Sequence, residues 1–228
     1  MTFVMRSLLA VSFAVLSANA TFAQDDTSCP ENPTETATLA KVQGTKRAYF
    51  QSDKNGCPWT GGKCNSSSYV IPGNTVIVSK IREGYVCAYY TGSSGYSGWL
   101  PASQVEEMPV NSNPPLSAWL GKWSPAEDVA AVTISEHKGE LMVKGQAWWP
   151  DREGIPEYPN PNEGVMDGKL SRIGNIAKWA DPPCEVTFTL LEPFLIVNDN
   201  EFIIRAAGQG SCWGANVDFT GVYPRAND

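Results

Sequence analysis

Residues 69–90 read YVIPGNTVIVSKIREGYVCAYY, and this stretch decides the fold class. Its β-branched and aromatic residues fall into short runs, which Pro72-Gly73-Asn74 and Glu83-Gly84 separate. Proline presets one backbone dihedral, and glycine or asparagine accepts a positive φ, so both separators are turn signals. The second separator is typical of a hairpin. The stretch therefore predicts strands at 69–71, 75–81 and 85–90.

Short runs of the same kind recur along the chain, while helical periodicity is almost absent. In the first half we expect further strands at 47–51 and 98–100. In the second half we expect strands at 129–135, 140–148, 165–170, 175–179, 185–191, 194–198, 201–205 and 217–223. Many short strands at this spacing are typical of small barrels or sandwiches. The predicted fold class is all-β, with a small N-terminal barrel and a C-terminal antiparallel barrel of about eight strands.

The length of 228 residues suits one large or two small domains. A polar segment at 24–37 is expected to be loose apart from Cys29. Residues 106–118, EEMPVNSNPPLSA, contain three prolines and read as a linker. We therefore predict two domains, at 38–105 and 119–225.

Residues 1–23 read MTFVMRSLLAVSFAVLSANATFA and have the pattern of a signal peptide. Arg6 gives the positive start, Ser7 to Ser17 form an apolar run, and small residues follow at two candidate cleavage sites. The alternative is a membrane anchor, but the apolar run is shorter than the roughly 20 residues that cross a bilayer. We expect a periplasmic or secreted protein that is not embedded in the membrane.

Six cysteines follow the predicted signal peptide, and an even number in an exported chain indicates up to three disulfides. A zinc site is disfavoured because no C-x-x-C pair occurs and His137 is the single histidine. Cys184 and Cys212 are alone in the second half, so we expect them to pair. For the first half we favour Cys57–Cys64 with Cys29–Cys87, while the other pairings stay open.

The charge balance excludes one class of function. The chain has 17 Lys and Arg against 24 Asp and Glu, a formal net charge of -7. An acidic chain is poorly suited to nucleic acid, whose phosphates require a basic face. A single histidine, no G-x-S-x-G motif and no glycine-rich phosphate loop argue against common catalytic centres. We predict no catalytic residues, no metal and no cofactor.

The first domain resembles the bacterial SH3-like (SH3b) family over residues 38–105. The resemblance rests on the order of four segments: R47-A-Y-F-Q-S, Y69-V-I-P-G-N-T-V-I-V, E83-G-Y-V-C-A-Y-Y and S97-G-W-L-P-A-S-Q-V. It implies a small barrel whose aromatic groove engages a peptide or a cell-wall fragment. The candidate ligand-binding residues are Trp59, Tyr85, Tyr89 and Tyr96. The alternative is that such aromatics fill the core of the barrel. Trp59, in the loop between Cys57 and Cys64, is expected on the surface.

The second domain contains six of the eight tryptophans, and Gly121-x-Trp123 resembles the first-strand signature of calycin-type barrels such as lipocalins. That resemblance implies that Trp123 closes the base of the barrel beneath an arginine of the last strand, a part that Arg225 could take. The domain also resembles a recurrent module without a described activity at the C-termini of exported bacterial proteins. Trp148 and Trp149 are further candidate ligand-binding residues.

An acidic loop after Trp149 raises the hypothesis of an enzyme. Paired carboxylates beside aromatics are how glycosidases hold and cleave sugars, whereas the spacing of a calcium loop is absent. A solvated acidic loop is the commoner explanation. We therefore predict an exported binding protein; the alternatives are an interaction module or inhibitor of another exported protein, and a carbohydrate hydrolase. The carboxylates of the loop are Asp151, Glu153, Glu157, Glu163 and Asp167.

Overall fold

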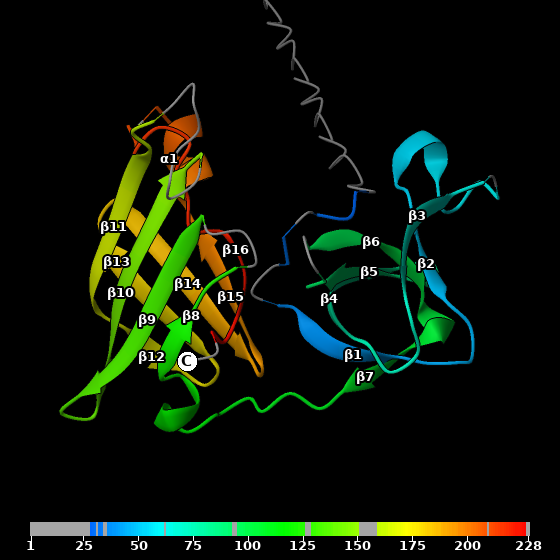
Figure 1. Ribbon diagram of the computed structural model, residues 1–228, viewed down its shortest axis with the longest axis horizontal. Helices are drawn as coiled ribbons and strands as arrows, with labels where there is room; N and C mark the ends of the chain where they lie inside the picture. Colours follow the sequence, from blue (N-terminus) through cyan, green and yellow to red (C-terminus); the bar gives the residue numbers. More distant parts are fainter. Residues whose placement is uncertain are drawn as a thin grey trace, which may run out of the picture.

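The computed structural model describes residues 28–30, 32–33, 36–61, 63–92, 95–125, 129–150, 159–208 and 210–226. These residues form an all-β protein of sixteen strands in three antiparallel sheets (Figure 1). No sheet in this part of the chain closes into a barrel. Within the same residues, no helix is long and apolar enough to cross a bilayer. The expected signal peptide at 1–23 lies outside the described residues.

A seven-stranded sheet forms the N-terminal module, in the order β3-β2-β6-β5-β4-β1-β7. Glu83 and Gly84, with φ of 47° and 83°, make the predicted hairpin turn between β4 and β5. The predicted turn at Pro72-Gly73 connects β3 to β4, and there the Asn74 side chain accepts a hydrogen bond from the Ile71 amide (2.9 Å). The strands are β1 (Thr38–Val42), β2 (Ala48–Gln51), β3 (Asn65–Val70), β4 (Thr75–Arg82), β5 (Tyr85–Tyr90), β6 (Tyr96–Pro101) and β7 (Val105–Met108), with 3-10 turns η1 (Lys54–Gly56) and η2 (Ala102–Gln104).

Close packing of β6 on β2 depends on Gly98. A Cβ added there would lie 3.2 Å from the Phe50 Cβ and 3.3 Å from the Gln51 carbonyl oxygen. Phe50 is almost fully buried at the centre of the module's core. The missing side chain of Gly98 therefore allows β6 to pack closely against β2 beside the Phe50 side chain.

The connection between the modules is shorter than the predicted linker at 106–118. Strand β7 pairs with β1 along its whole length, so the first sheet continues to Met108. At the other end, the 3-10 turn η3 (Leu116–Ala118) packs on the C-terminal core. Only residues 109–115 connect the modules, along the lower edge of Figure 1. The sequence does not predict β7, because Glu106 and Glu107 interrupt the apolar pattern of this edge strand.

The C-terminal module contains two sheets in which each strand pairs with its neighbour in sequence. A bridge between Trp123 of β8 and Arg225, the residue directly after β16, links the two sheets. The four-stranded sheet consists of β8 (Gly121–Trp123), β9 (Ala130–His137), β10 (Glu140–Trp149) and β11 (Asn162–Lys169). The five-stranded sheet consists of β12 (Ser171–Ile173), β13 (Ile176–Asp181), β14 (Cys184–Leu191), β15 (Phe194–Asp199) and β16 (Gly221–Pro224).

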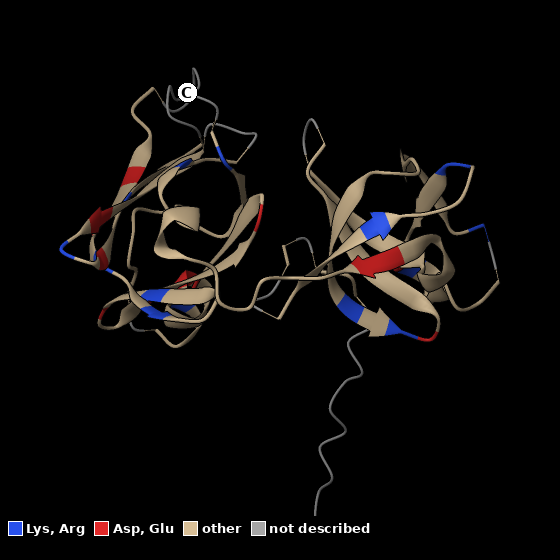
Figure 2. Ribbon diagram, turned by 90° about the horizontal axis from the view of Figure 1, so that it is seen from below, with Lys and Arg blue, Asp and Glu red and all other residues tan. Residues whose placement is uncertain are grey.

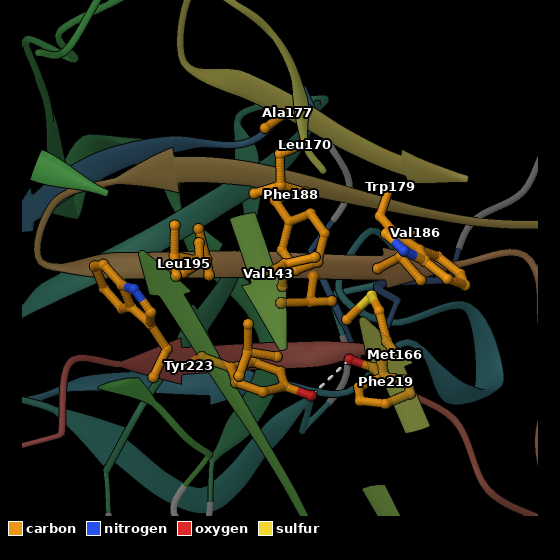
Figure 3. Packing of buried hydrophobic residues seen from close by; sticks show 14 of the residues in the cluster. Val143, Met166, Leu170, Ala177, Trp179, Val186, Phe188, Leu195, Phe219 and Tyr223 are labelled. Atoms are coloured by element: carbon orange, nitrogen blue, oxygen red, sulfur yellow. Dashed lines mark hydrogen bonds between the residues drawn. The ribbon is translucent and has the colours of Figure 1, made fainter. Parts of the chain in front are cut away.

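Apolar side chains from both sheets form one core, shown in Figure 3. Val143 and Met166 come from the first sheet, and Phe188 and Leu195 from the second. The buried Tyr223 hydroxyl donates a hydrogen bond to the Phe219 carbonyl (2.7 Å). Burial raises the pKa of Tyr223 well above its ordinary value, so the phenol stays a donor.

Trp123 is fully buried at one end of this core, as expected of a structural residue. Its Nε1 donates a hydrogen bond to the Trp119 carbonyl (3.0 Å). The Arg225 guanidinium lies 4.2 Å from the centre of the Trp123 ring and also donates to the carbonyls of Ala118 and Leu120. The expected stacking of Arg225 on Trp123 is present.

The strand predicted at 201–205 is wrong, because Glu201–Ala206 is the helix α1. The buried Glu201 carboxylate accepts hydrogen bonds from Arg205 one turn later, from the Ser211 hydroxyl (2.6 Å) and from the Cys212 amide (2.7 Å). A helical turn allows this convergence, whereas an extended segment would carry Arg205 away. Phe202 and Ile203, whose apolar character suggested a strand, are exposed.

Three disulfides link the pairs that the sequence favoured. Cys29–Cys87 attaches the N-terminal segment to β5, and Cys57–Cys64 closes the loop between β2 and β3. Cys184–Cys212 joins β14 to the segment after α1. Three disulfides indicate an oxidising environment.

An apolar seam joins the two modules. Leu39 of β1 and Ile77 of β4 form one buried cluster with Phe194 and Ile196 of β15 and with Val222 of β16. Nearby, the Asn198 side chain donates a hydrogen bond to the Pro33 carbonyl (3.1 Å), so the N-terminal segment contacts both modules. Burying several aliphatic side chains, at about 1.5–3 kcal/mol each, stabilises this arrangement.

Candidate ligand-binding cleft

A cleft of about 830 Å³ lies between the modules, next to the apolar seam. A volume of this size accommodates a small ligand or a short polymer segment. The N-terminal module contributes the ends of β2 and β5 and the start of β6, and the N-terminal segment contributes Cys29 and Asn32. The C-terminal module contributes the start of β9, the end of β10, strand β16 and the turn before it.

Four of the six predicted ligand-binding aromatics line this cleft: Tyr89, Tyr96, Trp148 and Trp149. Tyr96 is the most exposed of them, at 39%, and its ring packs on Phe50 with 4.9 Å between the ring centres. Trp148 is largely buried, while Tyr89 and Trp149 are partly buried. Each module thus supplies two of the predicted aromatic residues to one cleft.

Trp59 and Tyr85 lie elsewhere, in a small cluster with Trp99 and the Cys29–Cys87 disulfide. The ring of Trp59 meets Trp99 edge-on at 5.2 Å between centres, and Arg82 stacks over it at 4.7 Å. The expected surface position of Trp59 is wrong, because the closed loop folds back onto the sheet and the ring is partly buried. The sequence reveals the disulfide-closed loop but not the direction in which its tip folds.

Polar groups on both walls accompany the aromatics, and three of the lining residues are charged: Asp53, Lys54 and Asp218. The Asp53 carboxylate accepts a hydrogen bond from the Cys29 amide (3.3 Å), which ties this wall to the N-terminal segment. On the opposite wall, Asp218 accepts a hydrogen bond from the Thr220 amide (2.9 Å). Each wall therefore presents one carboxylate to the cleft.

Desolvation acts on the carboxylates of the C-terminal wall. Burial raises the pKa of Asp218 above its ordinary value, against the opposing effect of the Thr220 amide, and the charge of Glu201 raises it further. Behind it, burial also raises the pKa of Asp199, which accepts bonds from the Phe219 amide (2.5 Å) and the Trp213 indole (3.2 Å). A hydrogen-bond donor or a cation in the cleft would offset this desolvation.

Strand β16 adds backbone groups to the cleft. One side of β16 pairs with β15, and on the other side the Pro224 carbonyl accepts a bond from the Ser124 amide (3.3 Å). Alternate residues of an antiparallel strand direct both backbone groups to the same side, so Val222 faces the same way as Pro224. Within the described residues, nothing bonds to the Val222 amide or carbonyl on that side. Strand β16 thus borders the cleft with backbone groups of Val222 that point away from β15.

Sequence analysis missed the residues around β16, including Asn216, Asp218 and Thr220. The available signal was a short polar turn immediately before a strand, since loops held on a rigid scaffold often carry function. That signal does not specify which other loops lie opposite. This turn and Asp53 are more than 160 residues apart in the sequence, and they line the same cleft because the two modules pack together.

Most of the acidic loop lies outside the described residues, which exclude Asp151, Glu153 and Glu157. Glu163 and Asp167 lie on β11 and are exposed. Glu163 accepts a hydrogen bond from Gln146 (3.0 Å), and Asp167 lies 3.6 Å from Lys144. These two carboxylates do not line the cleft.

Charge differs between the modules (Figure 2). Residues 38–108 contain seven Lys and Arg against four Asp and Glu, whereas residues 119–226 contain nine against fifteen. Among the described residues, no group of three or more His, Cys, Asp or Glu is arranged to hold a metal ion. Comparisons with protein-family models, with curated proteins and with solved structures found no match.

Proposed function

We propose that the chain is an exported, non-enzymatic binding protein of the bacterial periplasm or cell envelope, and that it holds a peptide or cell-wall fragment between its two modules. The observation that carries the proposal is the convergence of Tyr89, Tyr96, Trp148 and Trp149 on one cleft. Aromatic walls with a few polar groups are typical of ligand sites. The apolar seam supports it, because a fixed contact between the modules holds both walls in place before a ligand arrives.

We also propose that the N-terminal module is an SH3-like domain and the C-terminal module a relative of the calycin barrels. The turns at Pro72-Gly73 and Glu83-Gly84 support the first assignment. The meander of strands and the stacking of Arg225 on Trp123 support the second. The ligand site proposed here differs from the groove implied by SH3-like domains alone, since Trp148 and Trp149 come from the C-terminal module.

A role without catalysis is favoured by the positions of the acidic residues. Glu163 and Asp167 are exposed on β11, where they contact Gln146 and Lys144, and they lie outside the cleft. A glycosidase needs one carboxyl group that stays protonated to act as the general acid. Asp53 and Asp218 line the cleft together with polar groups that are suited to holding a ligand.

Retention on purified cell-wall sacculi tests the proposal. The chain without residues 1–23 should co-sediment with sacculi, and Tyr96→Ala and Trp149→Ala should each reduce the bound fraction at least fivefold. Tyr69→Ala is the matched control, because Tyr69 is 40% exposed, like Tyr96, but lies outside the cleft. Equal retention of all variants, or no retention of the parent chain, would contradict a wall-binding cleft.

A second candidate function, interaction with another exported protein, is favoured by α1. Phe202 and Ile203 are 82% and 66% exposed on adjacent positions of this helix, and paired exposed apolar side chains are common where proteins meet. Capture of an exported protein that is lost in Phe202→Ser and kept in Tyr96→Ala would favour this function over the cleft.

A further inference from the structure

We infer that the Cys184–Cys212 disulfide is a site of reversible thiol–disulfide exchange with a dithiol in the folded protein, and that its reduction loosens one wall of the cleft. The second part rests on the proposed function, because it concerns the ligand cleft. Three features support this role: the exposure of the disulfide, the bonds that hold its two cysteines in place, and the position of the segment that follows Cys212.

Access to the sulfur atoms is the first feature. Cys184 and Cys212 are both partly exposed, whereas the four cysteines of the other two disulfides are buried. A thiolate must reach a sulfur atom to attack it, and exposed disulfides are the more easily reduced ones. The Arg205 guanidinium pairs with the Glu201 carboxylate that lies next to the Cys212 amide, so the negative charge there is balanced. We therefore expect Cys184–Cys212 to react first.

The exchange conserves atoms and electrons. One thiolate of the external dithiol attacks a sulfur of the bridge, the S–S bond breaks, and a mixed disulfide forms while the other cysteine leaves as a thiolate. The second thiol of the reagent then attacks the mixed disulfide and frees the first cysteine. The dithiol becomes a disulfide, and two electrons and two protons pass to Cys184 and Cys212.

Non-covalent bonds hold both cysteines in place without the S–S bond. The Cys212 amide donates to the buried Glu201 carboxylate (2.7 Å) at the start of α1. The Asn200 side chain, directly before Glu201, bonds to both neighbours of Cys184: it accepts from the Glu185 amide and donates to the Pro183 carbonyl (both 2.9 Å). The two thiols therefore stay close enough for the bridge to form again.

The segment that follows Cys212 connects the disulfide to the cleft. It contributes three lining residues: Asn216, Asp218 and Thr220. At its far end, Asp199 accepts a hydrogen bond from the Phe219 amide (2.5 Å). At its near end, the disulfide fixes Cys212 covalently to β14. Reduction removes the covalent link at the near end alone, so residues 211–218 gain freedom while the sheets stay folded. A wall that must become ordered when a ligand arrives binds that ligand less tightly.

Selective reduction tests the exchange site. The chain without residues 1–23 is treated with dithiothreitol at neutral pH without denaturant, and the free thiols are alkylated and located by mass spectrometry. Cys184 and Cys212 should be labelled about tenfold faster or more than the other four cysteines, and oxidised glutathione should restore the bridge. Equal rates for the three disulfides, labelling that accompanies loss of the native tryptophan fluorescence, or failure of the bridge to form again would overturn the exchange site.

Hydrogen exchange tests the loosening of the wall. In the double variant Cys184→Ser with Cys212→Ser, the amides of residues 211–218 should exchange about tenfold faster than in the parent, while β14 and β15 keep the parent rates. The matched control is Cys57→Ser with Cys64→Ser, which removes a disulfide of the other module and should leave residues 211–218 unchanged. If the first variant does not fold, the parent treated with dithiothreitol takes its place. Unchanged exchange in residues 211–218 would overturn the loosening.

Retention on sacculi separates the failure of this inference from the failure of the proposed function. The double variant at Cys184 and Cys212 should be retained about threefold less than the parent, and the control variant at Cys57 and Cys64 should be retained equally. Equal retention of the parent and the first variant overturns the control of the cleft and leaves the proposed function standing. If the parent is not retained, the proposed function fails, and hydrogen exchange in residues 211–218 alone decides whether reduction loosens the segment.

Discussion

Glu201→Gln removes the charge from a buried, hydrogen-bonded carboxylate of the C-terminal module while keeping its shape. Glu201 is only 4% exposed and accepts bonds from the Arg205 side chain, the Ser211 hydroxyl and the Cys212 amide. The last of these partners belongs to the Cys184–Cys212 disulfide. The carboxylate therefore holds α1 and the segment that follows it against β14.

The expected cost at pH 7 is about 2 kcal/mol, because hydrogen bonds to a charged group contribute about 1.5–3 kcal/mol and glutamine keeps part of the network. Burial alone would raise the pKa of Glu201, but the bonds from Ser211, Arg205 and Cys212 outweigh it and lower the pKa below its ordinary value of 4.5. A lowered folded pKa gives stability that is present above 4.5 and is lost as the pH falls through the folded value.

Urea unfolding at pH 7 and pH 3, followed by tryptophan fluorescence with the disulfides intact, measures this difference. With a slope of about 2 kcal/mol per M, Glu201→Gln should lower the midpoint by about 1 M at pH 7. The shift should shrink at pH 3, because the stability that a lowered pKa provides is lost as the pH falls from 4.5 toward the folded value. Glu163→Gln, on the exposed face of β11, should stay within about 0.5 kcal/mol of the parent at both pH values. A shift of equal size at pH 7 and pH 3 would refute the role of the charge.

Three further predictions follow from the fold. Trp123→Ala should cost about 3–5 kcal/mol, as for other truncations of large core side chains; a loss below 1 kcal/mol in urea unfolding would contradict its structural role. Ile196→Asp should separate the modules by burying a charge in the seam, so limited proteolysis should cut the chain within 109–115, whereas an unchanged pattern would argue against the seam. Alkylation without reductant should label no cysteine, and a mass increase on two or more cysteines would contradict the three disulfides.

Local signals in the sequence predict the β fold well. The Glu83-Gly84 hairpin and the turn at Pro72-Gly73 each depend on a few neighbouring residues whose backbone preferences are strong. The burial of Trp123 beneath Arg225 followed from a resemblance in the first strand. The even cysteine count predicts three disulfides, and the separation of the last two restricts how they pair.

Features that depend on contacts between residues far apart in the sequence were not predicted. Phe202 and Ile203 made a strand plausible, but the partners of Glu201 lie ten and eleven residues further along and favour a helix. Trp59 was expected on the surface because its loop is short, yet the loop folds back onto Trp99. The cleft is the strongest example, since Asp53 and Asp218 line one cleft only because the two modules pack along an apolar seam.

The most direct test of the cleft is an NMR titration that follows the indole N–H signals of the eight tryptophans, assigned by single Trp→Phe substitutions. With soluble fragments of digested sacculi, the signals of Trp148 and Trp149 should shift or broaden in proportion to occupancy. Those of Trp59, Trp99 and Trp123, which lie outside the cleft, should stay in place. Shifts at Trp59 and Trp99 with unmoved Trp148 and Trp149 would place the ligand on the N-terminal module alone and contradict a site between the modules.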